Sequence, residues 1–315
     1  MSILVVGVIA YDTVKTPVEI RHEVLGGPAV YFSLAASHFS PVSVTAVVGS
    51  DFRENDLQML RDHEVDVTGV RRVQGGKTFR WVAEYGERFD EAHTLDTQLN
   101  VFADFKPSLL ADARRSPFLF LANLDPDLQW DVFNQLDQRP MLVATDTMNL
   151  WINDKNDSLQ KVIKISDTLL INEAEIKQLT GEMNVVRAAQ QLLDQGPSMI
   201  VVKRGQYGSM FFTNGEVFAA PAYPLETVVD PTGAGDTFAG GFLGYLAGCN
   251  DISIDSCRRA LIVGTVMASF AVESFGPERL SLLTGAEIEE RYAQLWRLTY
   301  FDQSGDRKLP LRSVA

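Results

Sequence analysis

The feature that most restricts the fold is a regular alternation of short apolar runs with segments of helical periodicity. Apolar runs lie at 3–10, 42–49, 117–122, 140–145, 168–172 and 198–202. Helical patterns lie at 28–39, 52–63, 126–138, 157–166, 173–180 and 184–195. Strands that are apolar throughout are buried on both faces, and their alternation with helices favours parallel pairing. The sequence therefore predicts one three-layer α/β/α domain over residues 1–300, with a mostly parallel central sheet.

Two regions interrupt this alternation. Residues 13–24 and 65–102 are rich in β-forming residues and contain little that resembles a crossover helix. Segments such as VTGVRRV and KTFRWVAEY alternate apolar and polar side chains, as half-exposed antiparallel strands do. We expect them to form a small projecting β-sheet that serves as a lid or as a surface for homodimer formation. The polar segment 301–315 is expected to be a loosely held tail.

Composition argues against several classes of partner and site. The chain has 41 acidic and 28 basic residues, and a net charge of −13 opposes binding to nucleic acid or to an anionic membrane. No apolar run reaches the length of a membrane span, and residues 1–12 lack the basic region of a signal peptide. Cys249 and Cys257 are the only cysteines, and the four histidines show no metal-ligand spacing. These features favour a cytoplasmic protein without disulfides or a Cys/His metal site.

The stretch VVDPTGAGDTFAGG, residues 228–241, places two carboxylates on either side of a turn of small residues. Asp230 precedes the turn Thr232-Gly233-Ala234-Gly235, and Asp236 follows it where a helical pattern begins. One interpretation is that Asp236 caps the helix, because Asp accepts hydrogen bonds from free amides there. The other is that the bare amides and the helix N-terminus bind an anion, with Asp236 as a base beside it. The stretch alone does not separate these two interpretations.

Polar residues also follow the carboxyl ends of several predicted strands, where ligands bind in parallel α/β sheets. Asp12 comes just past the first strand and would accept hydrogen bonds from vicinal hydroxyls, or is a turn residue. Gly26 and Gly27 lead into a helix and allow close approach to the backbone, or form a plain turn.

Two further groups have equally open interpretations. Asn172 and Glu175 bring an amide and a carboxylate to the first turn of a helix, which suits Mg²⁺ bound through water or simple helix capping. Lys203, Arg204, Gly205 and Gly208 offer two cations and a glycine turn, as a phosphate site or a hairpin would. Asn123, Asp125 and Asp146 also follow strand ends, and for these we favour helix capping over substrate contact.

In this order, the motifs resemble those of the ribokinase-like carbohydrate kinases, the PfkB family. The most specific match is DPTGAGDTFAGGFLG, residues 230–244, which is similar to the C-terminal signature of that family. Asn172 and Glu175 match its NxxE motif, Lys203 to Gly208 its nucleotide turn, and Gly26-Gly27 its N-terminal diglycine. The segment 49–51 is also similar, and the resemblance extends from about residue 3 to about residue 280.

The resemblance implies an ATP-dependent kinase with a ribokinase-like fold. Asp236 would be the catalytic base, and the amides of Gly233, Ala234 and Gly235 would form the anion hole for the transferred phosphoryl group. Other implied roles cover Mg²⁺ held through water (Asn172, Glu175), nucleotide binding (Asn172, Lys203, Arg204, Gly205, Gly208, Thr232), acceptor binding (Asp12, Gly26, Gly27, Tyr31) and a possible K⁺ site (Asp230, Thr232).

One departure from the family concerns the acceptor. Tyr31 stands where the family usually carries a substrate-binding asparagine, and Phe79, Trp81 and Tyr85 add aromatic rings in the expected lid. A hydroxymethyl group of a sugar is the default acceptor, and the 5′-hydroxyl of a nucleoside is the alternative that these rings favour.

Three rival functions fit less well. A dinucleotide-binding GxGxxG is ruled out by Phe238 at its sixth position, and no GxxxxGK[ST] motif of a P-loop kinase is present. A catalytically idle sugar- or nucleoside-sensing protein would have no need for Asp236, Asn172 and Glu175 together.

Overall fold

The computed structural model describes residues 1–87, 89 and 92–300. Within this part of the chain, one large sheet has the strand order β13-β12-β11-β10-β9-β8-β1-β4-β5. Its strands are β1 (Ile3–Val6), β4 (Val42–Gly49), β5 (Asp66–Val73), β8 (Phe118–Leu121), β9 (Leu142–Asp146), β10 (Thr168–Asn172), β11 (Met199–Lys203), β12 (Ser209–Phe212) and β13 (Val217–Ala220). All neighbours from β5 to β11 pair in parallel, and β12 and β13 complete the sheet with antiparallel pairs.

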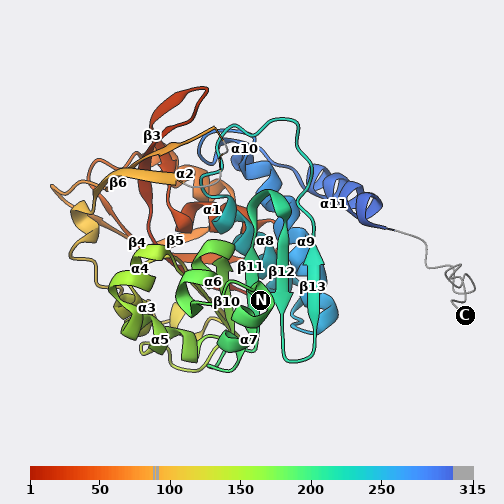
Figure 1. Cartoon of the computed structure of the whole chain (residues 1–315). Helices are drawn as coiled ribbons and strands as arrows, with labels where there is room; N and C mark the ends of the chain where they lie inside the picture. Colours follow the sequence, from red (N-terminus) through yellow and green to blue (C-terminus); the bar gives the residue numbers. More distant parts are fainter. Residues whose placement is uncertain (88, 90–91, 301–315) are drawn as a thin grey trace, which may run out of the picture.

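Helices cover both faces of this sheet (Figure 1). Ile3 and Val5 pack on one side and Leu4 and Val6 on the other, as expected for a strand that is buried on both faces. The first side carries α1 (Pro28–Ser37), α2 (Glu54–Asp62), α8 (Ala234–Cys249), α9 (Ile254–Ala271), α10 (Glu278–Ser281) and α11 (Gly285–Thr299). The second side carries α3 (Pro126–Phe133), α4 (Asn149–Asp154), α5 (Asn156–Ile165), α6 (Glu173–Thr180) and α7 (Val185–Leu193). The predicted three-layer α/β/α architecture is confirmed.

A separate four-stranded sheet forms the lid, which projects at the upper left of Figure 1. Its order is β3 (Ile20–Gly26), β2 (Ala10–Lys15), β6 (Phe79–Tyr85) and β7 (Ala92–Gln98). The parallel pair β2–β6 joins two antiparallel hairpin-like pairs, β2–β3 and β6–β7. The small β-sheet predicted from the alternating segments is therefore present.

The structure corrects the predicted assignment of two segments, 3–10 and 66–73. Residues 3–10 are not one strand, because the chain leaves the large sheet after Val6 and enters the lid at Ala10. Asp12 consequently lies inside β2 and not in a turn after the first strand. Residues 66–73 belong to the large sheet, because β5 pairs with β4 at its edge. An edge strand has one partly exposed face, so its apolar–polar alternation resembles that of a lid strand.

The tail at 301–315 lies outside the described residues. Where the structure does describe the chain, no helix combines the length and apolar character needed to span a membrane.

Candidate active site

The turn before α8 presents backbone amides beside Asp236 that have no hydrogen-bond partner among the described residues. Gly233 is the N-cap residue of α8 and has a left-handed φ of 76°, which favours glycine. Asp236 lies in the first turn, and no side chain caps the helix, so the capping interpretation of Asp236 is wrong. The amide of Ala234 donates to the carbonyl of Pro231 at 3.2 Å, but no described residue accepts from the amides of Gly233 or Gly235. The turn can therefore offer at least two free N–H groups to an anion.

The diglycine makes room for a carboxylate of the protein itself. A Cβ atom at Gly26 would lie 1.9 Å from Oδ2 of Asp12, and Gly27, at φ 91°, donates its amide to Asp12. Asp12 is only 4% exposed, although an aspartate with an ordinary pKa is charged at neutral pH. Burial, together with the charges of Asp230 and Asp236, raises the pKa of Asp12 to about 8. The two glycines therefore leave space for the Asp12 carboxylate at the site, in addition to allowing a ligand to approach their own backbone.

Asp236 itself is surrounded by charged groups but is still partly exposed. Desolvation, followed by the charge of Asp146, raises the pKa of Asp236 to about 7, and Lys203 opposes this rise. Burial also raises the pKa of Asp230, which is 1% exposed. Its Oδ1 accepts from the amide of Thr232 at 2.9 Å, whereas its buried Oδ2 has no partner among the described residues. An unpaired buried carboxylate oxygen is costly and is suited to binding a cation.

Lys203 provides the positive charge of this site. Its Nζ lies 2.7 Å from Oδ2 of Asp146, and a Cβ atom at Gly235 would lie 3.1 Å from the same Nζ. Burial opposes the charge of Lys203, but the carboxylates of Asp146, Glu175 and Asp236 raise its pKa. Lys203 therefore stays cationic beside the first turn of α8.

Asp146 was expected to cap a helix, and this expectation is wrong. The N-cap residue of α4 is Met148, and Asp146 pairs with Lys203 instead. Asp125 does cap α3 by accepting from the amide of Asp127 at 3.0 Å. Asn123 accepts from the indole of Trp151 at 2.9 Å and caps no helix. The signal that identifies Asp146 is its place at the end of β9, next to the ends of β10 and β11 that supply Asn172 and Lys203.

Asn172 and Glu175 form a capping box at the start of α6. Oδ1 of Asn172 accepts from the amide of Glu175 at 2.8 Å, and Oε2 of Glu175 accepts from the amide of Asn172 at 2.9 Å. Desolvation, with the charge of Asp146 also contributing, raises the pKa of Glu175 to about 7 against the effect of Lys203. The other oxygen, Oε1, has no protein partner within the described residues, so Glu175 fits a water-mediated cation better than Asn172 does.

The glycine turn after β11 connects an antiparallel pair, as the hairpin interpretation predicted. Gly208 has a φ of 89°, and a Cβ atom there would lie 2.0 Å from the carbonyl oxygen of Ala220, whereas Gly205 faces open space. Arg204 pairs with Glu173 at 2.6 Å, and Glu173 also pairs with Lys177. Arg204 thus lies against Glu173, whereas Lys203 is the cation whose Nζ lies beside Gly235 in the turn before α8.

Two aromatic side chains from other elements contact this turn. Tyr31 of α1 is 1% exposed, and a Cβ atom at Gly233 would come within 2.4 Å of its ring. Tyr85, the last residue of β6, accepts a hydrogen bond from Oγ1 of Thr232 at 3.1 Å. Phe79, at the opposite end of β6 from Tyr85, packs edge-on against Phe102. The structure therefore brings Tyr31 and Tyr85, but not Phe79, to the predicted anion hole.

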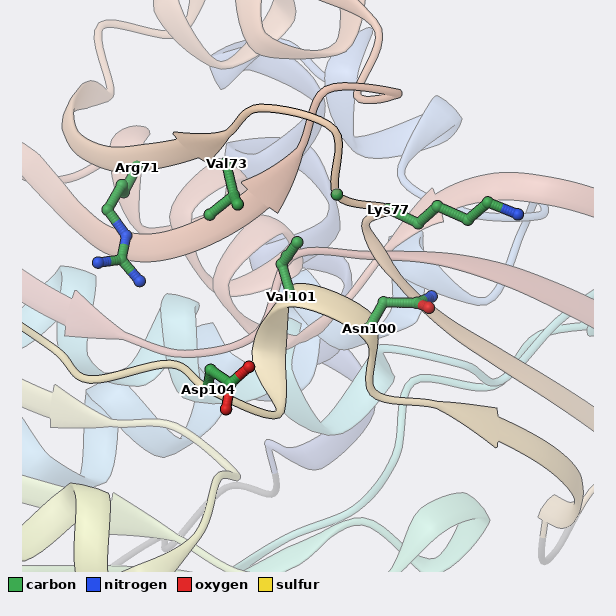
Figure 2. Close-up of a pocket in the computed structure, with 7 residues that line it drawn as sticks. Arg71, Val73, Lys77, Asn100, Val101 and Asp104 are labelled. Atoms are coloured by element: carbon green, nitrogen blue, oxygen red, sulfur yellow. The ribbon is translucent and has the colours of Figure 1, made fainter.

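A hollow of about 560 Å³ lies apart from these residues, at the base of the lid. Arg71, Lys77, Asn100 and Asp104 are among the residues that line it. Figure 2 shows that the side chains of Arg71 and Lys77 point in different directions, so their charges do not converge on one ligand.

Comparison with known proteins agrees with this geometry. Residues 3–283 match the model of the pfkB family of carbohydrate kinases, and the chain belongs to that family. It is 27% identical over 272 residues to a cytidine kinase of Thermococcus kodakarensis, covering 83% of this chain and 96% of the relative. It is 33% identical over 241 residues to an uncharacterized sugar kinase of Archaeoglobus fulgidus, covering 73% and 90%.

The fold matches that of solved kinases in the same way. A putative ribokinase II from E. coli, crystallised with ATP and Mg²⁺, superposes with a TM-score of 0.77 at 19% identity over 93% of this chain and 99% of the other. The chain is therefore a carbohydrate or nucleoside kinase with the ribokinase-like fold.

Proposed function

We propose that the protein transfers the γ-phosphoryl group of Mg·ATP to a primary hydroxyl of a ribosyl compound, with a nucleoside as the favoured acceptor. The observation that carries the proposal is the arrangement at α8. The carboxylate of Asp236, the free amides of Gly233 and Gly235 and the ammonium of Lys203 meet at one helix start.

The catalytic roles follow from charge and proton balance. Asp236, ionised, accepts the proton of the acceptor hydroxyl as the new P–O bond forms. The amides of Gly233 and Gly235 stabilise the charge on the phosphoryl oxygens, and Lys203 adds a fixed positive charge from the other side. The position of the Lys203 Nζ beside Gly235 supports Lys203, and not Arg204, as the phosphate contact.

Two cations fit the residues around these groups. Glu175 would hold Mg²⁺ through water, because its Oε1 has no partner among the described residues and the nearby Lys203 favours its ionised form. The bound ion would neutralise charge on the ATP phosphates. Asp230 would hold a monovalent cation, since its Oδ2 is buried without a protein partner among the described residues.

The acceptor would lie between Asp12 and Asp236. Burial, followed by the charges of Asp230 and Asp236, raises the pKa of Asp12, and the charge interaction with Asp236 is consistent with one substrate reaching both carboxylates. Asp12 pairs in register with Trp81 of the neighbouring strand, and paired residues of adjacent strands project to the same face. We therefore assign Asp12 to the ribose hydroxyls and Trp81 to the base, in agreement with the near full-length similarity to a cytidine kinase.

A free sugar phosphorylated on its hydroxymethyl group is the second candidate, favoured by the similarity to a sugar kinase. Release of ADP from Mg·ATP should be measured with matched pairs of acceptors, such as cytidine against ribose. The proposal predicts strong stimulation by a nucleoside and weak stimulation by the free sugar. The reverse order would establish the sugar kinase, and stimulation by neither would contradict both.

Dimer formation through the lid also remains a proposal. The strand β7 is exposed along its whole length and lies at the edge of the lid sheet, where backbone groups are free to pair. Sedimentation velocity of the protein and of a variant with a charged residue in place of Leu95 on β7 would test it. A monomer at all concentrations would contradict it.

A further inference from the structure

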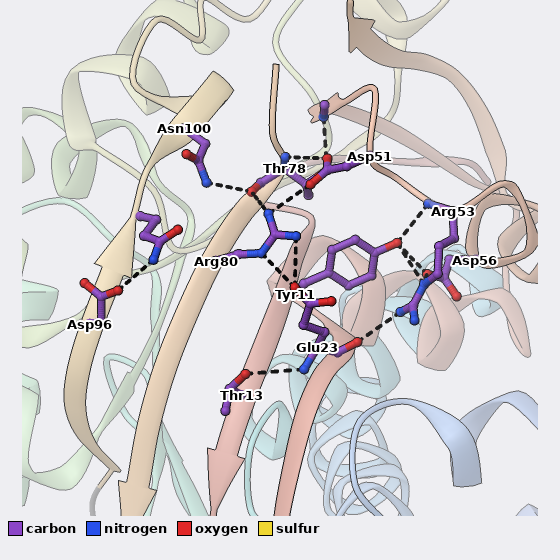
Figure 3. Close-up of polar contacts among 12 residues, drawn as sticks. Tyr11, Thr13, Glu23, Asp51, Arg53, Asp56, Thr78, Arg80, Asp96 and Asn100 are labelled. Carbon is purple, nitrogen blue, oxygen red and sulfur yellow. Dashed lines mark hydrogen bonds and ion pairs between the residues drawn. The ribbon is translucent and has the colours of Figure 1, made fainter. Parts of the chain in front are cut away.

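The lid strand β6 is attached to the rest of the protein at its two ends by bonds of different kinds. Near its start, Arg80 forms an ion pair at 2.9 Å with Asp51, which lies outside the lid, and a second one at 3.0 Å with Glu23 of the lid strand β3 (Figure 3). At its end, the hydroxyl of Tyr85 meets Thr232 in the turn before α8. Arg80 and Tyr85 are five residues apart, which corresponds to roughly 17 Å along a strand. The second attachment therefore lies far from the first and connects the lid directly with the catalytic turn.

The first end is held by several charged contacts. Asp51 also accepts from the amide and the hydroxyl of Thr78, the residue that precedes β6. Nearby, the ring hydroxyl of Tyr11 in β2 donates to Asp56 and accepts from Arg53 (Figure 3). Charge-assisted bonds of this kind are stronger than neutral ones. This end has the properties of a fixed hinge.

Within residues 1–87, 89 and 92–300, the hydrogen bond of the Tyr85 side chain to the rest of the protein is the single neutral one from Thr232. Burial, with the charges of Asp230, Asp12 and Asp236 adding to it, raises the pKa of Tyr85, so its hydroxyl stays protonated at neutral pH. One neutral bond is weak enough to break and re-form during turnover. Its partner Thr232 directly precedes Gly233, whose backbone also packs against the ring of Tyr31. The catalytic turn is thus held between a fixed ring from α1 and a releasable hydroxyl from the lid.

We propose that Tyr85 is a positioning residue that couples closure of the lid over the acceptor to the arrangement of the catalytic turn. The same lid sheet carries Asp12, whose neighbouring strand is β6 itself. An acceptor bound at Asp12 fixes the lid, and the Tyr85–Thr232 bond transmits that position to the amides of Gly233 and Gly235. This inference rests on the proposed kinase function and adds a residue to it.

The test is a double-mutant cycle with Tyr85→Phe and Thr232→Val, each of which removes one hydroxyl and keeps the approximate shape. Tyr85→Phe should raise the acceptor KM by about 3- to 10-fold, as expected for one lost hydrogen bond. It should also raise ATP hydrolysis relative to phosphoryl transfer, because the lid excludes water less well. The double variant should be no worse than the more damaging single variant. Tyr300→Phe, on the exposed end of α11, serves as the control without effect.

Two results would overturn the inference. One is an unchanged acceptor KM and unchanged hydrolysis-to-transfer ratio in Tyr85→Phe. The other is that the effects of the two single changes multiply in the double variant, because the hydroxyls would then act independently.

A failure of the proposed function is distinguishable, because the wild-type protein would then phosphorylate no sugar or nucleoside. In that case the role of the Tyr85–Thr232 hydrogen bond in holding the lid is tested by acrylamide quenching of Trp81 fluorescence. The Trp81 signal is the difference between the fluorescence of the protein and that of a Trp81→Phe protein. Greater quenching in Tyr85→Phe than in wild type supports the proposal that this bond holds the lid, and equal quenching overturns the proposal.

Discussion

Replacement of Lys203 by methionine tests the electrostatics of the site through folding stability. The ammonium of Lys203 lies 2.7 Å from Asp146, and the side chains are 17% and 4% exposed. Methionine keeps most of the volume of the lysine stem and removes the charge. Asp146 would then be buried without a cation, while Glu175 and Asp236 would lose the positive charge that opposes their raised pKa values.

The expected loss is large because only one partner of a buried pair is removed. Such changes cost roughly 3–5 kcal/mol, and because Lys203 keeps some solvent contact we expect the lower end, about 3 kcal/mol. The matched control is Lys177→Met, since Lys177 and Glu173 are 25% and 28% exposed and Glu173 keeps Arg204 as a partner. Partly exposed pairs contribute only about 0–1 kcal/mol.

Urea unfolding of both variants at pH 8 and at pH 6 measures these losses. Without Lys203, the folded-state pKa values of Glu175 and Asp236 rise further above their unfolded values. The folded protein then binds more protons than the unfolded chain, so its stability falls as pH rises through this range. The Lys203→Met protein should therefore be less destabilised at pH 6 than at pH 8. Addition of Asp146→Asn should restore much of the stability but not the activity. A loss in Lys203→Met no greater than that in Lys177→Met would refute the reasoning.

Three further predictions concern the metal, the base and the acceptor. Glu175→Gln keeps the capping geometry but removes the charge, so the Mg²⁺ concentration required for half-maximal activity should rise several-fold; an unchanged magnesium titration would rule out this role. Because Asp236 must be ionised to act as a base and its pKa is raised to about 7, kcat/KM should fall as pH decreases through that value, and a flat profile from pH 6 to 8 would contradict the assignment. Trp81→Leu should raise the KM of a nucleoside by roughly 5- to 100-fold, since stacking of a base on an aromatic ring contributes about 1–3 kcal/mol, and should leave the KM of a free sugar nearly unchanged; equal effects on both acceptors would remove Trp81 from the base site.

Much of the fold could be predicted because burial leaves a direct pattern in the sequence. The apolar run at Leu169–Ile171 is buried on both faces and forms β10 as expected. The run at 3–10 was misleading because its residues are buried both in the large sheet and in the lid, so hydropathy does not mark where the chain passes between them. The edge strand β5 was assigned to the lid for a similar reason, since one partly exposed face gives the same alternation in either sheet.

The site was predictable where the residue type itself carries the chemistry. Gly233 and Asp236 were identified because a turn of small residues followed by a carboxylate at a helix start resembles the C-terminal signature of the PfkB family, whereas the stretch alone left helix capping open. Asp146 was named from its place after a strand, but its role was mispredicted as helix capping, because capping and ion pairing favour the same residue type and only the proximity of the ends of β9 and β11 distinguishes them. The contact of Tyr85 with Thr232 joins residues 147 positions apart, so no local pattern reveals it.

The central claim is that Asp236 is the base of a phosphoryl transfer, and it is tested most directly by comparing Asp236→Asn with wild type in two assays. Asparagine removes a desolvated charge, so the variant should fold at least as stably as wild type at pH 8. Calorimetric titration should give ATP affinities of the two proteins within about threefold of each other. The kcat of Asp236→Asn, measured with an identified acceptor, should be about 10²- to 10⁴-fold lower than that of wild type. Wild-type turnover in a folded Asp236→Asn protein that binds ATP would contradict the account.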